Sequence, residues 1–296
     1  MSDQLTKILA YHQEIRIVVV EGTKAVNEAV SRHQTWHTAS AVLGRTMMGA
    51  CLLAANLKGQ DNISVLIKGQ GPVGQVQADA DGKGHVRAFV SNPHVALDLN
   101  PQGKLDVKGA IGLPGMLSVK KQIANETPFV GQVNLVSGEI AEDFTYYMAV
   151  SEQTPSSIGL SVLVRPDESI QSAGGFMVQV MPGAQEETIA SLEEAVGQLS
   201  NLSGIFQEED PVSTLMSYLC PSGDYKMIDQ YPIQFKCPCS KDKFSRALSL
   251  ISVEDLQAMI EEDHGAETIC HYCQEEYNFS ENELKELIEE KAGEEK

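Results

Sequence analysis

The sequence predicts an α+β protein with an N-terminal α+β core domain, a helical linker and a small cysteine-rich domain at the C-terminus. The strand-like segments of residues 1–181 run in a block with helical segments before and within it, whereas a doubly wound parallel sheet would alternate the two. Residues 185–199 have the spacing of an amphipathic helix, and four of the six cysteines lie in the last sixty residues. We therefore expect domains at 1–181 and 235–296, joined by a metastable linker at 182–234.

Hydrophobic periodicity predicts each element of the N-terminal domain in order. The β-branched run 15–20 predicts a strand that Gly22 ends. Helices follow at 24–34 and 38–57, and the second is rich in Ala, Gly and Met, which favours close packing on its neighbours. Further strands are expected at 62–68, 74–79, 84–91, 104–108, 116–121, 129–137, 157–165 and 175–181, with a helix at 140–152.

Two glycine-containing loops resemble ligand-binding motifs but are better explained as hairpin turns. Residues 69–74 have the Gly-x-Gly-x-x-Gly spacing of a dinucleotide-binding loop. The segment after them alternates as a strand, and Pro72 suits a turn better than the start of a phosphate-binding helix. Residues 79–84 begin like a calcium loop, but they lack the third ligand and the closing glutamate.

No catalytic site is predicted. His33 and His37 have the i, i+4 spacing of a zinc-binding helix, but residue 34 is Gln where such a motif needs Glu, and no third ligand is evident. We expect them to be surface or core histidines. Because the sequence also lacks a nucleophile elbow, a phosphate loop and paired catalytic carboxylates, we expect a protein that is not an enzyme.

The negative charge is concentrated in the C-terminal part of the chain. Residues 1–181 carry 16 acidic and 14 basic side chains, and residues 182–296 carry 25 and 8, within a total net charge of −19. The acidic part repels phosphate, so no nucleic-acid partner is expected. The most apolar helix, 39–57, contains Arg45 and is too polar to span a bilayer. With no export signal visible, the unpaired-looking thiols favour a cytoplasmic location and no membrane partner.

The linker begins with a helix that has one apolar stripe. Glutamates occupy its other faces, so the stripe needs a neighbouring surface to cover it. After the helix, Pro211 and Pro221 break the chain into short pieces, which predicts marginal stability. The stripe is a candidate hydrophobic surface and consists of Ile189, Leu192, Val196 and Leu199.

Two tight cysteine pairs predict a metal site in the C-terminal domain. Cys237-Pro-Cys239 and Cys270-His-Tyr-Cys273 are separated by 30 residues, and each short loop can turn two sulfurs toward one point. Four thiolates at tetrahedral angles form the closed coordination shell of structural zinc. We therefore expect one Zn²⁺ per reduced chain, and a domain of about sixty residues whose folding depends on it, because such binding is worth roughly 10–16 kcal/mol.

Other interpretations of the cysteines remain open at this point. The four could be reduced core cysteines or a dithiol-exchange centre, although two pairs in a polar segment suit a metal better. His264 and His271 are the fallback ligands. Cys51, in the apolar helix, and Cys220, in the linker, are expected not to bind the metal.

With these motifs, the chain resembles the heat shock protein 33 family, the redox-regulated holdase chaperones of bacteria. The resemblance covers nearly the whole length, and its most specific part is the combination of Cys-x-Cys with Cys-x-x-Cys. The matching segments are Phe235-Lys-Cys-Pro-Cys-Ser240, Cys270 to Phe279, Ala173 to Pro182, Leu53 to Lys58 and Gly69 to Pro72.

The resemblance implies a thiol switch. Cys237, Cys239, Cys270 and Cys273 would hold zinc in the reduced, inactive state. Oxidants would form the disulfides Cys237–Cys239 and Cys270–Cys273, release the metal and unfold the C-terminal domain and linker. The active form, usually a homodimer, would bind unfolding proteins without ATP under oxidative and heat stress. The alternative is a constitutive zinc-ribbon interaction module on a small-molecule-binding domain.

Overall fold

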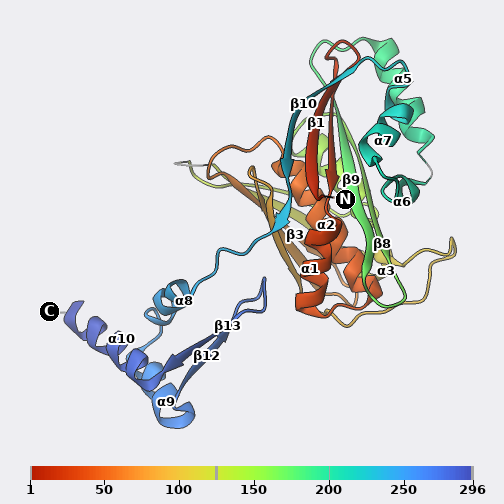
Figure 1. Cartoon of the computed structure of the whole chain (residues 1–296). Helices are drawn as coiled ribbons and strands as arrows, with labels where there is room; N and C mark the ends of the chain where they lie inside the picture. Colours follow the sequence, from red (N-terminus) through yellow and green to blue (C-terminus); the bar gives the residue numbers. More distant parts are fainter. Residues whose placement is uncertain (1, 124–125, 200, 295–296) are drawn as a thin grey trace. The chain divides into compact units, whose positions relative to one another are not determined.

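A computed structural model describes residues 2–123, 126–199 and 201–294 of the chain (Figure 1). By its internal contacts the chain divides into two compact units, Met1–Lys236 and Cys237–Lys296. Helices and sheets are mixed in both, which confirms the predicted α+β class. The division into three segments, with boundaries at residues 181 and 234, stays a prediction.

One sheet of the larger unit has five antiparallel strands in the order β10-β1-β2-β9-β8. Both faces of this sheet are covered. Val18 and Val20 of β2 pack in the main core, whereas Ile17 and Val19 pack in a second core on the opposite face. This explains why the sequence of β2 contains a continuous run of β-branched residues. The strands are β1 (Gln4–Ala10), β2 (Ile15–Glu21), β8 (Ser156–Val164), β9 (Ile170–Val180) and β10 (Tyr225–Pro232).

The other sheet has six strands in the order β11-β5-β4-β3-β6-β7, and its only parallel pair is β11 with β5. The glycine-rich segment 69–74 is the turn between β3 and β4, as predicted, and Gly74 has the positive φ that favours glycine. The strands are β3 (Asn62–Lys68), β4 (Gln75–Asp81), β5 (His85–Val90), β6 (Met116–Gln122), β7 (Phe129–Asn134) and β11 (Gln234–Phe235).

Helix α2 contacts strands of both sheets and is buried along nearly its whole length, so it forms the centre of the main core (Figure 1). Its small residues are required by close packing. A Cβ added at Gly49 would lie 2.1 Å from the ring of Phe144, which is closer than any real contact. The helices of this core are α1 (Thr23–His33), α2 (His37–Ala54), α3 (Val107–Ile111) and α4 (Ala141–Val150).

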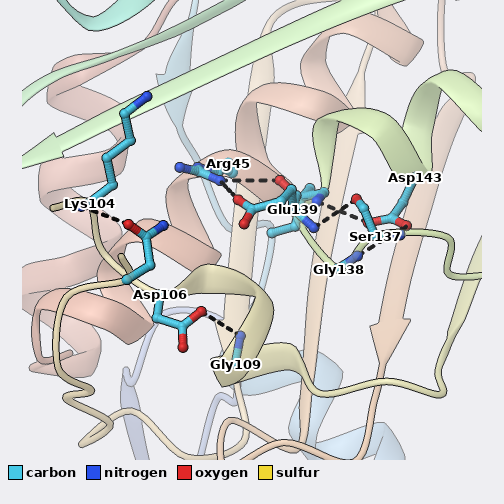
Figure 2. Close-up of polar contacts among 10 residues, drawn as sticks. Arg45, Lys104, Asp106, Gly109, Ser137, Gly138, Glu139 and Asp143 are labelled. Atoms are coloured by element: carbon cyan, nitrogen blue, oxygen red, sulfur yellow. Dashed lines mark hydrogen bonds and ion pairs between the residues drawn. The ribbon is translucent and has the colours of Figure 1, made fainter. Parts of the chain in front are cut away.

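A polar network fixes the start of α4 against α2 (Figure 2). The fully buried Asp143 carboxylate accepts hydrogen bonds from the backbone N–H groups of Val136, Ser137 and Ile140 at 2.8–3.0 Å. Arg45 of α2 donates to Glu139 at 2.9 Å. The Asp143 carboxylate therefore satisfies three backbone N–H groups of the loop that leads into α4.

Three helices of the predicted linker pack on the outer face of the five-stranded sheet (Figure 1). They are α5 (Glu186–Gly197), α6 (Leu202–Ile205) and α7 (Pro211–Leu219). Their side chains and the sheet share one apolar cluster, which we call the outer core. Its buried members are Ile8, Ala10, Ile15, Ile17, Val19, Phe176, Val178, Leu192, Ile205, Phe206, Val212, Leu215, Met216, Leu219 and Cys220.

The structure corrects the prediction of a strand at 104–108. Leu105 makes only an isolated bridge with Leu99, and helix α3 begins at Val107 because the Asp106 carboxylate accepts from the N–H of Gly109 at 2.8 Å (Figure 2). Strands β1 and β10 were not predicted. The segment 182–234 therefore holds three helices but ends in a strand that pairs with β1.

In the smaller unit, the described residues 237–294 form three helices and a hairpin around a small core. The buried side chains are Leu248, Leu256, Phe279, Leu284 and Leu287. The predicted capping box is present, because the N–H of Ser280 donates to Glu283 at 2.9 Å and the N–H of Glu283 donates back to Ser280 at 3.4 Å. The elements are α8 (Lys241–Leu248), α9 (Val253–Asp263), β12 (Gly265–Ile269), β13 (Glu276–Ser280) and α10 (Glu281–Glu294).

Candidate metal centre

The first cysteine pair lies in the extended segment that leads into α8. Ser240 caps that helix by accepting from the N–H of Lys243 at 3.3 Å. The ammonium of Lys243 turns back and donates to the carbonyl of Pro238, the residue between the two cysteines. The cap and this lysine together fix the backbone that carries Cys237 and Cys239.

The second pair lies in the turn of the β12–β13 hairpin. The N–H of Cys270 donates to the carbonyl of Glu275 at 2.9 Å, and the N–H of Gln274 donates to the carbonyl of Cys270 at 2.8 Å. Gln274 adopts the left-handed conformation, with φ 59°, which allows so tight a reversal. The sequence predicted this knuckle and hairpin, and the structure contains both.

The turn and the segment before α8 bring the four sulfurs to one point. All four Sγ atoms lie within 4.8 Å of one another. The Cys237–Cys270 distance is 3.7 Å and the Cys239–Cys273 distance is 3.2 Å. Sulfurs at the corners of a zinc tetrahedron are about 3.8 Å apart, given Zn–S bonds of about 2.3 Å. The donor set and spacing therefore fit a tetrahedral metal with no open position.

The electrostatics of the group also favour a bound cation. Burial raises the pKa of the Cys239 and Cys273 thiols, because desolvation penalises their charged form. The hydroxyl of Tyr277 donates to the Sγ of Cys239 at 3.2 Å, and this bond raises the pKa of the tyrosine. A divalent cation would compensate the charge that four clustered thiolates accumulate.

The histidines considered as ligands lie outside the group of four sulfurs. His33 is buried, with Nε2 3.0 Å from the carbonyl of Ala88, and His37 lies 3.3 Å from Glu168, so the two do not converge. His264 lies 3.1 Å from Glu281, and neither it nor His271 belongs to the group of four sulfurs.

The two remaining cysteines lie in the larger unit. Cys51 is buried in α2, and burial raises the pKa of its thiol. Cys220 is buried in the outer core, with its Sγ 3.4 Å from the hydroxyl of Ser222. Neither belongs to the group of four cysteines that could hold a metal ion, which among the described residues lies entirely in the smaller unit.

The predicted linker stripe contacts the outer core only in part. Leu192 is buried there, Val196 and Leu199 pack against it at half-burial, and Ile189 is half-buried without belonging to the cluster. The sequence reasoning missed the larger contribution, which comes from α7. The sequence of α7 does contain the pattern that predicts an amphipathic helix, because Val212, Leu215, Met216 and Leu219 recur at helical spacing.

The structure thus combines a mixed helix-and-sheet core with a small unit in which four cysteine sulfurs are positioned to hold a metal ion in a closed tetrahedral shell. The family model described as Hsp33 protein matches residues 3–280. The chain belongs to the Hsp33 family.

The chain is similar to named relatives over nearly its whole length. It is 46% identical over 290 residues to the 33 kDa chaperonin of Enterococcus faecalis, covering 98% of this chain and 97% of that one. It is 48% identical over 289 residues to the 33 kDa chaperonin of Bacillus velezensis, covering 97% and 99%. The crystal structure of the Thermotoga maritima 33 kDa chaperonin matches with a TM-score of 0.92 at 36% identity, covering 99% and 100%. These names describe chaperones. Within the described ranges, no helix combines the length and apolar character that a bilayer crossing needs.

Proposed function

We propose that this chain is a redox-regulated, ATP-independent holdase that binds unfolding proteins in the cytoplasm under oxidative and heat stress. The observation that carries the proposal is the group of four cysteine sulfurs in a unit with only a small apolar core. Such a unit stays folded while its metal is bound and loses its main support when the ligands are oxidised.

Cys237, Cys239, Cys270 and Cys273 are the ligands in this proposal, and Zn²⁺ is the metal, one per chain. When bound, zinc supplies roughly 10–16 kcal/mol of folding free energy, which is comparable to the whole stability of a domain. The residues of the small core are too few to replace it.

Oxidation converts the ligands into two disulfides. A thiolate sulfur attacks hydrogen peroxide, the O–O bond breaks, and a sulfenic acid and hydroxide form. A second thiolate then displaces hydroxide from that sulfur, so the formation of each disulfide transfers two electrons from two thiolates to one peroxide molecule. In the proposed pairing, Cys237 joins Cys239 and Cys270 joins Cys273.

Two short sulfur distances, Cys237–Cys270 and Cys239–Cys273, run across the pairs, but they exist only while both loops are held together. Once the metal leaves, the partner in the same short loop has the higher effective concentration. Disulfides inside such small loops restrain little of the unit, since stabilisation by a cross-link grows with loop length. Cross-paired disulfides would instead hold the hairpin against the segment before α8.

The acidic half of the chain then opposes refolding. Residues 182–296 carry 25 acidic and 8 basic side chains, and their mutual repulsion disfavours a compact state once the metal is gone. The smaller unit unfolds, and the docking of α5–α7 loosens with it.

The outer core is the proposed client surface. Undocking of α5–α7 exposes Ile17, Val19 and Phe176 on the sheet and Leu192 and Leu215 on the helices. Large contiguous apolar patches of this kind bind other apolar surfaces, which suits unfolded proteins of varied sequence. The same exposed faces support homodimer formation in the oxidised state.

The test compares reduced and peroxide-treated protein under mild heat. Zinc release, hydrogen exchange of residues 182–294 and light scattering of a heat-unfolded client are measured together. The proposal expects zinc loss, lost protection and suppressed aggregation to occur together. If zinc leaves while the segment stays protected and the client aggregates as before, the switch is absent.

A second candidate, a constitutive zinc module on a small-molecule-binding domain, has one supporting feature. A cleft of about 440 Å³ in the larger unit is lined by Arg16, Lys121, Glu152, Gln179 and other residues, and Arg16 lies opposite Gln179 in the β2–β9 register. This candidate becomes the better one if zinc leaves on oxidation while residues 182–294 stay protected and the client aggregates as before.

A further inference from the structure

Tyr277 lies beside the four-cysteine group and bonds to one of its sulfurs. Its hydroxyl oxygen is 3.2 Å from the Sγ of Cys239. A thiolate has no proton to donate, so the tyrosine is the donor in this bond whenever Cys239 binds a metal as a thiolate.

Two elements of the smaller unit hold the tyrosine in this position. Its backbone pairs with Thr268 in the β12–β13 ladder, where the Thr268 hydroxyl donates to the carbonyl of Tyr277 at 3.3 Å. Its ring packs against Phe244 of α8, with ring centroids 5.0 Å apart. The hydroxyl is therefore fixed from both the hairpin and the helix that follows the first cysteine pair.

The bonded cysteine is one of two in the group that are only partly buried. Cys239 is half-buried, whereas Cys270 and Cys273 are only 5% and 4% exposed. A hydrogen bond to a thiolate withdraws electron density from the sulfur, and this lowers its nucleophilicity. Outer partners of this kind also tune how firmly a ligand holds its metal.

We propose that Tyr277 is a positioning residue that restrains the reactivity of the Cys239 thiolate toward electrophiles. In attack on hydrogen peroxide, the sulfur electron pair forms an S–O bond, the O–O bond breaks, and hydroxide leaves from the other oxygen. The Tyr277 bond slows this step, so it raises the oxidant concentration at which the switch responds. This last consequence rests on the proposed function, but the restraint on Cys239 does not.

The test measures alkylation of the zinc-loaded full chain by N-ethylmaleimide, which adds to thiolates without any redox step. Mass spectrometry with fragmentation assigns the label to Cys239. Tyr277→Phe keeps the ring and removes the hydroxyl, and Tyr146→Phe, which removes an exposed hydroxyl in the larger unit, is the matched control. The expected result is alkylation of Cys239 about tenfold faster in Tyr277→Phe than in the wild type or the control.

Zinc loss to a chelator, without electrophile, is measured on the same proteins. An unchanged Cys239 alkylation rate in Tyr277→Phe overturns the proposal. The proposal is also overturned if the alkylation rate of Cys239 rises by no more than the rate of spontaneous zinc loss does, since the tyrosine would then only stabilise the metal site. Client aggregation after treatment with increasing peroxide distinguishes this proposal from the proposed function. If Tyr277→Phe is alkylated faster but peroxide never leads to suppression of client aggregation, the restraint on Cys239 stands and the thiol switch is rejected.

Discussion

The Sγ atoms of Cys239 and Cys273 lie 3.2 Å apart, although the two residues are 34 positions apart in the sequence. The distance joins the segment before α8 to the β12–β13 turn, so each cysteine pair depends on the other for its place. Neither pair alone offers the four donors that a closed zinc shell requires.

Replacing any one of Cys237, Cys239, Cys270 and Cys273 by Ser is expected to weaken zinc binding by more than about 100-fold, beyond the effect typical of outer-shell changes. Chelator competition under reducing conditions measures it. Cys51→Ala, in the buried α2 helix of the larger unit, serves as the control and should bind zinc like the wild type. A Cys273→Ser protein with unchanged affinity would remove the ligand assignment.

A chain truncated after residue 236 is expected to unfold in one cooperative thermal transition, because the larger unit contains both sheets and both of its cores. A chain truncated after residue 181 should also fold, but it loses α5–α7 and β10, so it exposes the outer core and the edge of β1. We expect it to melt earlier and to bind a hydrophobic dye more strongly. Equal melting temperatures would show that the linker helices do not stabilise the sheet.

Leu215→Ala is expected to loosen the linker helices, because this fully buried side chain is central to the outer core. Removing it should cost about 2–5 kcal/mol of local stability. Hydrogen exchange of α5–α7 in the reduced protein should accelerate, with partial suppression of client aggregation before any oxidation. Tyr218→Ala changes an exposed side chain on the same helix and is the control. If both variants exchange alike, docking of α7 is not the restraint.

Glu21→Gln is expected to stabilise the larger unit at pH 7. Burial raises the pKa of Glu21, which accepts a hydrogen bond from Gln4 at 2.8 Å. For a carboxyl with a raised folded-state pKa, the favourable contribution is complete below the ordinary value of 4.5 and is lost as pH rises through the folded value. Denaturant unfolding should therefore favour the variant at pH 7, with the difference shrinking toward pH 4. Glu28→Gln, which changes an exposed glutamate of α1 that pairs with Arg32, is the control for removal of a surface charge.

Peroxide-treated protein is expected to contain Cys237–Cys239 and Cys270–Cys273 disulfides rather than the cross-pairs Cys237–Cys270 and Cys239–Cys273, whose sulfurs lie 3.7 and 3.2 Å apart in the folded unit. Peptide mapping under non-reducing conditions distinguishes the two patterns. Cross-paired disulfides would restrain the smaller unit after zinc loss, and unfolding of this unit could not then activate the protein.

The parts of the structure that the sequence revealed are those with a local signal. The cysteine pairs, the capping box at Ser280 and the turn at 69–74 each depend on a few adjacent residues. Strand β10 gave no such signal, because it is mostly exposed and lacks apolar alternation. The Tyr277–Cys239 hydrogen bond could not be predicted either, since the spacing of the cysteines does not indicate which side of the hairpin faces them. At 104–108 the alternation of Leu105 and Val107 predicted a strand, but the Asp106 cap stabilises the start of helix α3 instead.

The pairing of β1 with β10 places Gln4 opposite Pro232, which has a consequence for synthesis of the chain. A ribosome adds roughly 5–20 residues per second, so on the order of 10–50 s pass before the first strand can meet its outer neighbour. During that interval β1 has an unpaired edge, and such an edge makes the nascent chain itself prone to aggregation. This member of the Hsp33 family thus has an unpaired strand edge until its own residues 225–232 have been synthesised.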